Sequence, residues 1–288
     1  MTDAIPGPKI ILIGDSGTGK TYSIRTLLDA GITPFIIFTE PGMETLGDVL
    51  DKCHWKYISP HQMGWEGLKS VAKNVSILDY EGIAKMRDAN KPKYTELMDL
   101  IEQCNNFVDQ NGESFGDVMS WGTNRALVID SLSGLSDMAS QLTVGGKPVK
   151  GLQDWQVAQN MLKFLVNKLT TGCKCTFILM SHIARERDEI TGGTTLMVKT
   201  LGKALAPDLP IYFSDIIQTI RKGDKFSWST AGSNIAVKAR NVKISLELPA
   251  SFKPLFETWK KQGGVIEATA KEETEGKAPD ASKPAVTS

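Results

Sequence analysis

The chain of 288 residues is long enough to bury a full α/β core with a small appendage. Hydrophobic residues make up 41% and charged residues 23%, proportions that are ordinary for a soluble globular protein. Lys+Arg and Asp+Glu each total 33, so the net charge is zero and excludes attraction of nucleic acid by the charge of the whole chain. Any such contact must come from a local patch.

The first predicted element is an apolar strand at residues 10–13, which runs into Gly14-x-x-x-x-Gly19-Lys20-Thr21, the Walker A pattern of a phosphate loop. A helix is expected over 22–30, ended by Gly31. Glycines let successive backbone N–H groups turn toward a polyphosphate, and the helix N-terminus adds partial positive charge. Lys20 is expected to reach the β- and γ-phosphates, and the Thr21 hydroxyl to ligate Mg²⁺. The alternative is a glycine turn without a ligand.

The pattern therefore predicts a nucleoside triphosphate site. The residues expected to bind the nucleotide are consecutive in the chain: Gly14, Asp15, Ser16, Gly17, Thr18, Gly19, Lys20, Thr21 and Tyr22.

Strands and helices alternate along the next 170 residues. Apolar runs predict strands at 34–38, 55–58, 126–130 and 176–181, residues 64–110 are expected to be mainly helical with breaks near 90–92, and an apolar stripe predicts a helix over 152–169. Strands that alternate with helices imply right-handed crossovers and a parallel sheet.

Beyond Asp215 the alternation of strands and helices gives way to short strand-like segments joined by glycine turns. Short strands are expected at 215–220, 225–229 and 234–238, as antiparallel additions at one sheet edge, and a last helix at 251–261. We expect a core over 1–262 with a helical insertion at about 59–120, and a disordered tail over 263–288.

Polar residues end three of the predicted strands. Asp130 closes an apolar run, as the metal-holding carboxylate of a Walker B motif does, although it could instead cap the following helix. The carboxyl ends of parallel strands face the ligand crevice, so Asp130 and Thr21 are expected to emerge together. Glu40 ends a strand on the same rim. It would activate the attacking water as a general base, or it is a solvated turn residue. Glu44 is a weaker alternative for the base. His182 either senses the γ-phosphate or caps its strand.

These elements follow one another in the order found in RecA-like P-loop ATPases, which the chain resembles over residues 9 to about 245. The resemblance implies a mostly parallel twisted sheet flanked by helices, with antiparallel strands at one edge, and implies ATP and Mg²⁺ as ligands. It assigns Glu40 the role of catalytic base, and His182 the coupling of the γ-phosphate to DNA loops. Lys20 and Asp130 complete the expected catalytic set.

The pair Lys238 and Arg240 gives a further match. RecA-like ATPases often carry a Lys-x-Arg pair on a late strand that enters the ATP site of the neighbouring subunit. At strand spacing the two side chains point the same way, so both could reach one phosphate. The resemblance thus implies a homo-oligomer with shared ATP sites; the alternative is an ordinary basic edge-strand face.

More narrowly, the chain is similar to phage-encoded RecA-like ATPases related to single-strand annealing proteins. This likeness implies an ATPase of DNA recombination or annealing. The chain departs from the pattern in its long helical insertion, and no separate DNA-binding domain is visible. A RecA-like motor or helicase-type ATPase, and a nucleotide-gated assembly factor that does not hydrolyse ATP, are the competing interpretations.

Two stretches correspond to the DNA-binding loops of RecA-like recombinases, residues 143–151 and 184–203. Both combine glycine pairs with lysine or arginine, which could track the backbone of single-stranded DNA. Acidic residues dilute the charge of the second stretch and neither contains an aromatic residue, so solvated surface loops are the alternative.

Four cysteines without regular spacing indicate a reducing compartment rather than a disulfide scaffold. Cys173-x-Cys175 with His182, and Cys53-His54, fit no common zinc spacing, so buried or inactive thiols are expected. The sequence shows no signal peptide and no run of 18 apolar residues, which predicts no membrane association and a cytoplasmic protein, in the host cytoplasm if a phage encodes it.

Overall fold

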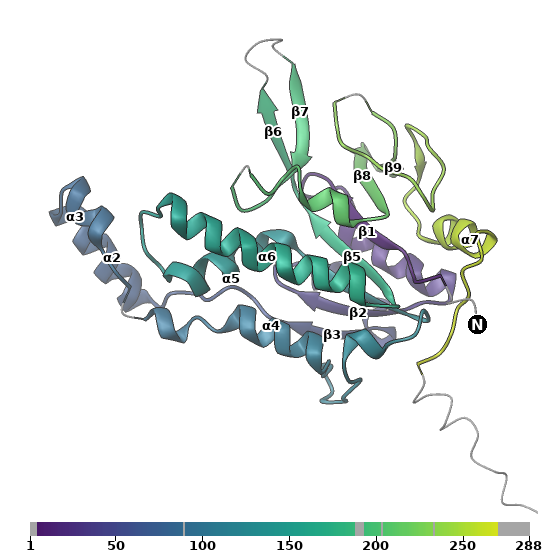
Figure 1. The fold of residues 1–288 in the computed structure, drawn as a ribbon, viewed down its shortest axis with the longest axis horizontal. Helices are drawn as coiled ribbons and strands as arrows, with labels where there is room; N and C mark the ends of the chain where they lie inside the picture. Colours follow the sequence, from purple (N-terminus) through teal and green to yellow (C-terminus); the bar gives the residue numbers. More distant parts are fainter. Residues whose placement is uncertain (1–4, 89, 188–192, 203, 233, 270–288) are drawn as a thin grey trace, which may run out of the picture.

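Figure 1 shows the computed structural model, which describes residues 5–88, 90–187, 193–202, 204–232 and 234–269. Its centre is an eight-stranded sheet with the order β10-β9-β8-β1-β5-β4-β2-β3. The strands are β1 (Lys9–Ile13), β2 (Thr33–Phe38), β3 (His54–Tyr57), β4 (Arg125–Asp130), β5 (Thr176–Ser181), β8 (Asp215–Lys222), β9 (Lys225–Ser229) and β10 (Leu248–Pro249). All pairs from β8 to β3 are parallel, whereas β9 and β10 are antiparallel additions at one edge. The expected mixed α/β class, with a mostly parallel sheet and antiparallel strands at one edge, is confirmed.

Both faces of this sheet are buried, which explains why its central strands read as unbroken apolar runs. In β1, Ile11 and Ile13 belong to one hydrophobic cluster, and Ile10 and Leu12 belong to the other. The alternation follows from the two-residue period of a strand. Two separate cores therefore fix the sheet between two layers.

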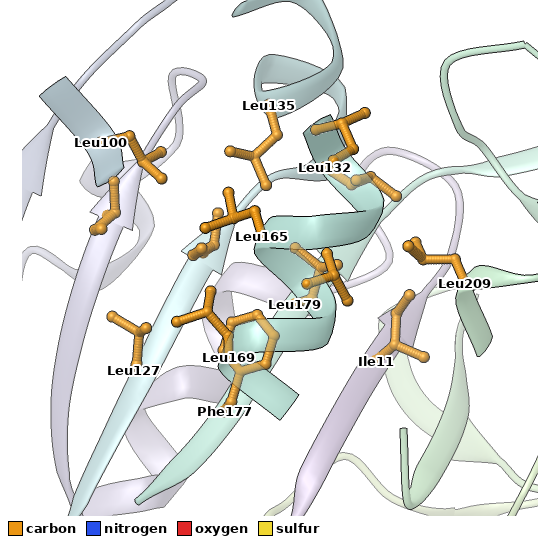
Figure 2. Close-up of a cluster of buried hydrophobic side chains, with 14 of the residues drawn as sticks. Ile11, Leu100, Leu127, Leu132, Leu135, Leu165, Leu169, Phe177, Leu179 and Leu209 are labelled. Atoms are coloured by element: carbon orange, nitrogen blue, oxygen red, sulfur yellow. The ribbon is translucent and has the colours of Figure 1, made fainter. Parts of the chain in front are cut away.

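The first layer is formed by α4 (Glu96–Asn105), α5 (Leu132–Val144) and α6 (Leu152–Gly172). Figure 2 shows leucines of these helices packed over side chains of β1, β4 and β5. The opposite core contains residues that follow the phosphate loop together with α7 (Lys253–Lys261), whose Phe256 and Trp259 are buried. The predicted stripe at 152–169 is confirmed as the buried face of α6 from Ala158 to Leu169, whereas Leu152 at its start is 90% exposed.

Two helices of the segment 59–120 project from one end of the molecule (Figure 1). These are α2 (Trp65–Ile77) and α3 (Tyr80–Lys85), and neither contains a buried residue. A short stretch at Lys91–Lys93 separates them from α4, at the expected break near 90–92.

Three local expectations need correction. The helix expected over 22–30 is a short α-helix, α1 (Lys20–Ser23), that continues as a 3-10 helix over Ile24–Ala30; Gly31 ends it with a φ of 77°. The first of the late strands, β8, lies parallel to β1 rather than antiparallel. Residues 234–238 form no strand but make single bridges, Ile235 with Leu196 and Lys238 with Ile216.

The two remaining strands form a hairpin that stands out from the main sheet (Figure 1). β6 (Ile183–Arg187) and β7 (Thr194–Val198) pair antiparallel in a sheet of their own. Only His182 separates β5 from β6, so the hairpin grows directly from the sheet edge where the phosphate loop lies.

Residues 264–269 run along the segment 122–124. Thr123 Oγ1 donates to the carbonyl of Val265 at 2.6 Å and accepts from the amide of Glu267 at 2.8 Å. The first part of the expected tail is therefore hydrogen-bonded to the core, and the part from 270 onward lies outside the described residues. Within the described part of the chain, the helices are too short or too polar to cross a membrane.

Candidate nucleotide site

The loop after β1 curls through two glycines in the left-handed region, Gly17 at a φ of 73° and Gly19 at 85°. Residues with a Cβ rarely adopt this conformation, so glycine is required at both positions. The loop leads directly into α1, and no side chain caps the N-terminus of this helix. This backbone shape is the one that cradles a phosphate group.

Gly14 meets a different restriction, the close approach of β8. A Cβ at Gly14 would lie 2.0 Å from Thr219 Oγ1 and 2.6 Å from Thr18 Oγ1. Thr18 Oγ1 and Thr219 Oγ1 are 2.7 Å apart, and Thr18 also donates to the carbonyl of Asp15. Gly14, Asp15 and Thr18 thus shape the loop without lining its cavity, and Thr219 supports them although no sequence pattern indicated it.

Lys20 is buried with only 7% of its surface exposed. Its Nζ donates to the carbonyls of Gly14 and Asp15, each at 2.9 Å, so the side chain folds back over its own loop. Burial lowers the pKa of Lys20, against the nearby carboxylates of Asp130 and Asp15, which raise it. A desolvated cation among carbonyl oxygens suits an incoming anion.

Thr21 and Asp130 come together from positions 109 residues apart. Thr21 Oγ1 donates to Asp130 Oδ2 at 2.6 Å. Asp130 is 8% exposed, and burial raises its pKa, an effect that the Thr21 hydroxyl opposes. The expected proximity is present, because β1 and β4 are parallel strands that end at one rim with β5 between them.

Glu40 and His182 both line the same cavity and lie close to one another. His182 Nε2 is 3.5 Å from Glu40 Oε2, and about a quarter to a third of each side chain is exposed. Hydrogen bonding to His182 is the main cause that lowers the pKa of Glu40, so its carboxyl is ionised at neutral pH. Glu44, the alternative base, is exposed and lies outside the lining of the cavity.

The cavity has a volume of about 390 Å³. It is lined by the loop, the end of β2, the two strand ends and one later strand: Ser16, Gly17, Gly19, Lys20, Thr21, Tyr22, Glu40, Pro41, Gly42, Thr45, Asp130, His182 and Phe226. Sequence reasoning assigned no role in the site to four of these lining residues: Pro41, Gly42 and Thr45, which follow Glu40 closely in the chain, and Phe226 in β9. The place of Phe226 depends on how β9 pairs beyond β8, which leaves no local signal.

Lys238 and Arg240 do not line this cavity. Lys238 Nζ donates to the carbonyl of Phe213 at 2.8 Å, and burial lowers its pKa. Arg240 is exposed, and its backbone amide donates to Asp215 Oδ1. Because the segment is not a strand, the argument from strand spacing that both side chains point the same way does not apply.

The two stretches considered for DNA differ in structure. In residues 143–151, Lys147 pairs with Asp154 at 3.3 Å and Lys150 donates to Ser140 Oγ at 2.5 Å. The stretch 184–203 contains most of the β6–β7 hairpin. Positions 188–192 and 203 of this stretch lie outside the described residues.

Arg185 of this hairpin forms two hydrogen bonds with Asp15 of the phosphate loop, at 3.0 and 2.5 Å. This bonding is the main cause that lowers the pKa of Asp15. The hairpin is thereby tied to the phosphate loop.

The four cysteines are buried and unpaired by disulfides: Cys53, Cys104, Cys173 and Cys175. Among the residues that the structure describes, no group of three or more His, Cys, Asp or Glu side chains is arranged to hold a metal ion. A magnesium ion at Thr21 and Asp130 would need the phosphate oxygens of a nucleotide to complete its ligands.

The sequence matches no protein-family model and no curated protein. Among solved structures, the crystal structure of the RadB recombinase aligns with 78% of this chain and 81% of its own, at 15% identity and a TM-score of 0.32. The roles of the site residues therefore rest on their geometry in this chain.

Proposed function

We propose that this protein binds ATP with Mg²⁺ and hydrolyses it in the service of DNA recombination or single-strand annealing. The observation that carries the nucleotide assignment is the contact of Thr21 Oγ1 with the buried Asp130 carboxylate at 2.6 Å, beside a glycine cradle that holds a buried lysine. A carboxylate, a hydroxyl and a lysine in this arrangement match the ligands of a magnesium–phosphate complex. The mostly parallel sheet with antiparallel strands at one edge is the architecture that the resemblance to RecA-like ATPases implies.

Thr21 and Asp130 would hold the magnesium ion. When bound, the ion would neutralise charge on the β- and γ-phosphate oxygens. Lys20 would exchange its two carbonyl partners for phosphate oxygens. Burial disfavours the ionised form of Asp130, and a bound cation would offset this cost by pairing with the carboxylate.

Glu40 is the candidate base. Its carboxylate would accept a proton from the water that attacks the γ-phosphorus, as the bond to the β-phosphate oxygen breaks and ADP leaves. His182 supports the ionised carboxylate from the end of β5. Because β6 follows His182 at once, a change at the γ-phosphate would be transmitted to the hairpin.

The nucleic-acid part of the proposal rests on the hairpin and on residues 143–151. Arg185 reaches the phosphate loop from β6, so the hairpin and the nucleotide could respond to one another. The lysines of residues 143–151 and Arg185 of the hairpin all have partners in the chain, so it is the tie between the hairpin and the phosphate loop that favours the hairpin for contact with single-stranded DNA.

A shared ATP site in a homo-oligomer is a further part of the proposal. The exposed Arg240 is the candidate finger for a neighbouring subunit, since Lys238 already binds a carbonyl. Mixing Glu40→Gln with Arg240→Ala subunits would restore part of the turnover if each supplies what the other lacks. No recovery would contradict the shared site.

The central test is ATP turnover with and without single-stranded DNA, alongside the mass of the assembly. We expect turnover that DNA stimulates, and DNA affinity that falls with salt. Lys20→Ala should abolish nucleotide binding, and Glu40→Gln should stop hydrolysis while ATP still binds. Turnover that no DNA alters, with no DNA binding at low salt, would contradict the recombination assignment. Unchanged biological activity of Glu40→Gln would favour a nucleotide-gated assembly factor.

A further inference from the structure

Two aromatic rings stand exposed at one side of the nucleotide cavity. Tyr22 follows Thr21 in α1 and is 48% exposed, and Phe226 extends from β9 and is 38% exposed. Both line the cavity. Their rings are nearly parallel, with an interplanar angle of 18° and centroids 6.2 Å apart. Large aromatic side chains bury much apolar area in most folded proteins. An exposed pair of aromatic rings at the mouth of a cavity therefore indicates a binding surface for a ligand.

Phe226 lies directly against the phosphate loop. A Cβ at Gly19 would be 2.8 Å from Phe226 Cδ1 and 3.2 Å from Cγ, so the ring covers the backbone just before Lys20. Tyr22 stands at the next position after the residue that contacts Asp130. The two rings therefore border the cavity beside the loop that would hold the phosphates.

Each ring also has an arginine over its face. The Arg25 guanidinium lies 3.8 Å from the Tyr22 ring centroid, and Asp48 holds it through two hydrogen bonds of 2.7 and 2.9 Å. The Arg221 guanidinium lies 5.4 Å from the Phe226 centroid, and its Nε donates to the carbonyl of Gly223. Guanidinium groups attract aromatic faces, so both rings are oriented before any ligand arrives.

We propose that Tyr22 and Phe226 hold the base of the bound nucleotide by stacking. The proposal rests on the proposed function, because it takes the triphosphate to lie in the loop. A stack recognises the face of a base and not its hydrogen-bonding edge, so purines, which have the larger face, bind more tightly than pyrimidines. The base is then selected by residues of α1 and β9, some 200 positions apart in the chain.

The test compares Phe226→Leu, which keeps apolar volume against Gly19 but removes the ring, with Phe226→Tyr, which keeps the ring. Tyr22→Leu and Tyr22→Phe form the second matched pair. Calorimetric titrations with Mg-ATP, Mg-CTP and Mg-tripolyphosphate separate the base from the phosphates. Circular dichroism of each variant checks that it is folded.

We expect both leucine variants to bind ATP about 5- to 150-fold more weakly, the range for loss of one base–aromatic stack. Their affinity for tripolyphosphate should stay as in the wild type, their preference for ATP over CTP should shrink, and the ring-keeping variants should bind ATP normally. Leucine variants that bind ATP as the wild type does would overturn the stacking role. So would equal losses for ATP and tripolyphosphate, which would assign Phe226 to packing on the loop. Wild-type protein that binds neither ligand would instead overturn the proposed function, and this inference with it.

Discussion

The Thr21 hydroxyl is predicted to stabilise the folded protein even without nucleotide. It donates to Asp130 Oδ2 at 2.6 Å, and Asp130 is only 8% exposed. Thr21→Val replaces the hydroxyl with a methyl group of similar size and leaves a buried carboxylate without this donor. A hydrogen bond to a charged group contributes about 1.5–3 kcal/mol, so the free energy of unfolding should fall by about that amount. Thr21→Ser keeps the hydroxyl and is the control.

The loss should depend on pH, with a sign that follows from Asp130. Burial raises the pKa of Asp130 in the folded protein above its ordinary value of 3.8, and the Thr21 hydroxyl counteracts this. Removing the hydroxyl raises the pKa further, so the ionised form costs more in the variant than in the wild type. The difference in stability between the wild type and Thr21→Val is therefore fully present above the pKa of Asp130 in the folded variant. It shrinks as pH falls from there toward 3.8.

Urea unfolding followed by circular dichroism, in EDTA and across pH 4–8, measures the effect. For a chain of this size the melting temperature should drop by about 3–12 °C at neutral pH. Adding Mg-ATP should raise the melting temperature of the wild type and of Thr21→Ser, and have little effect on Thr21→Val. If Thr21→Val unfolds as Thr21→Ser does at every pH, the hydrogen bond to Asp130 does not carry the stability assigned to it.

Three further changes test other contacts. Thr123→Val removes two hydrogen bonds to residues 264–269. The free energy of unfolding should fall by about 1–3 kcal/mol, and the amides of residues 264–269 should exchange their hydrogens faster. Unchanged exchange would contradict the docking of this segment. Arg185→Ala should raise the pKa of Asp15 toward its ordinary value, as a carbon-13 NMR titration of the carboxyl would show, because Arg185 lowers it in the wild type. Gly14→Ala places a Cβ 2.0 Å from a threonine hydroxyl of β8 and should destabilise the protein by about 1–3 kcal/mol; a melting temperature equal to that of the wild type would refute the close packing.

Local signals in the sequence were enough to place most of the central strands. Unbroken apolar runs identified β1, β2, β4 and β5, because strands buried on both faces need no polar side chains. The glycine spacing of the phosphate loop was equally local, since backbone conformation at Gly17 and Gly19 depends on those residues themselves. That Thr21 and Asp130 meet followed from one rule, the common rim of parallel strands.

The late part of the chain was less predictable. Nothing in residues 215–220 distinguishes a strand that pairs parallel with β1 from one that adds antiparallel, because the choice depends on which edge of the sheet is free. Residues 234–238 have the composition of a strand, yet they make only single bridges, with Leu196 and with Ile216. Pairing partners, and not local preference, decided these elements.

The candidate site divides in the same way. The sequence by itself determined the loop, its lysine and the carboxylates at the strand ends, because each is specified by a few neighbouring residues. Only the tertiary structure decided that Phe226 covers Gly19, that Thr219 supports Gly14, and that Arg185 binds Asp15. These contacts join segments about 170 to 207 positions apart, and they arise from the order of strands in the sheet. A side chain placed by the pairing of distant strands leaves no pattern in its own neighbourhood.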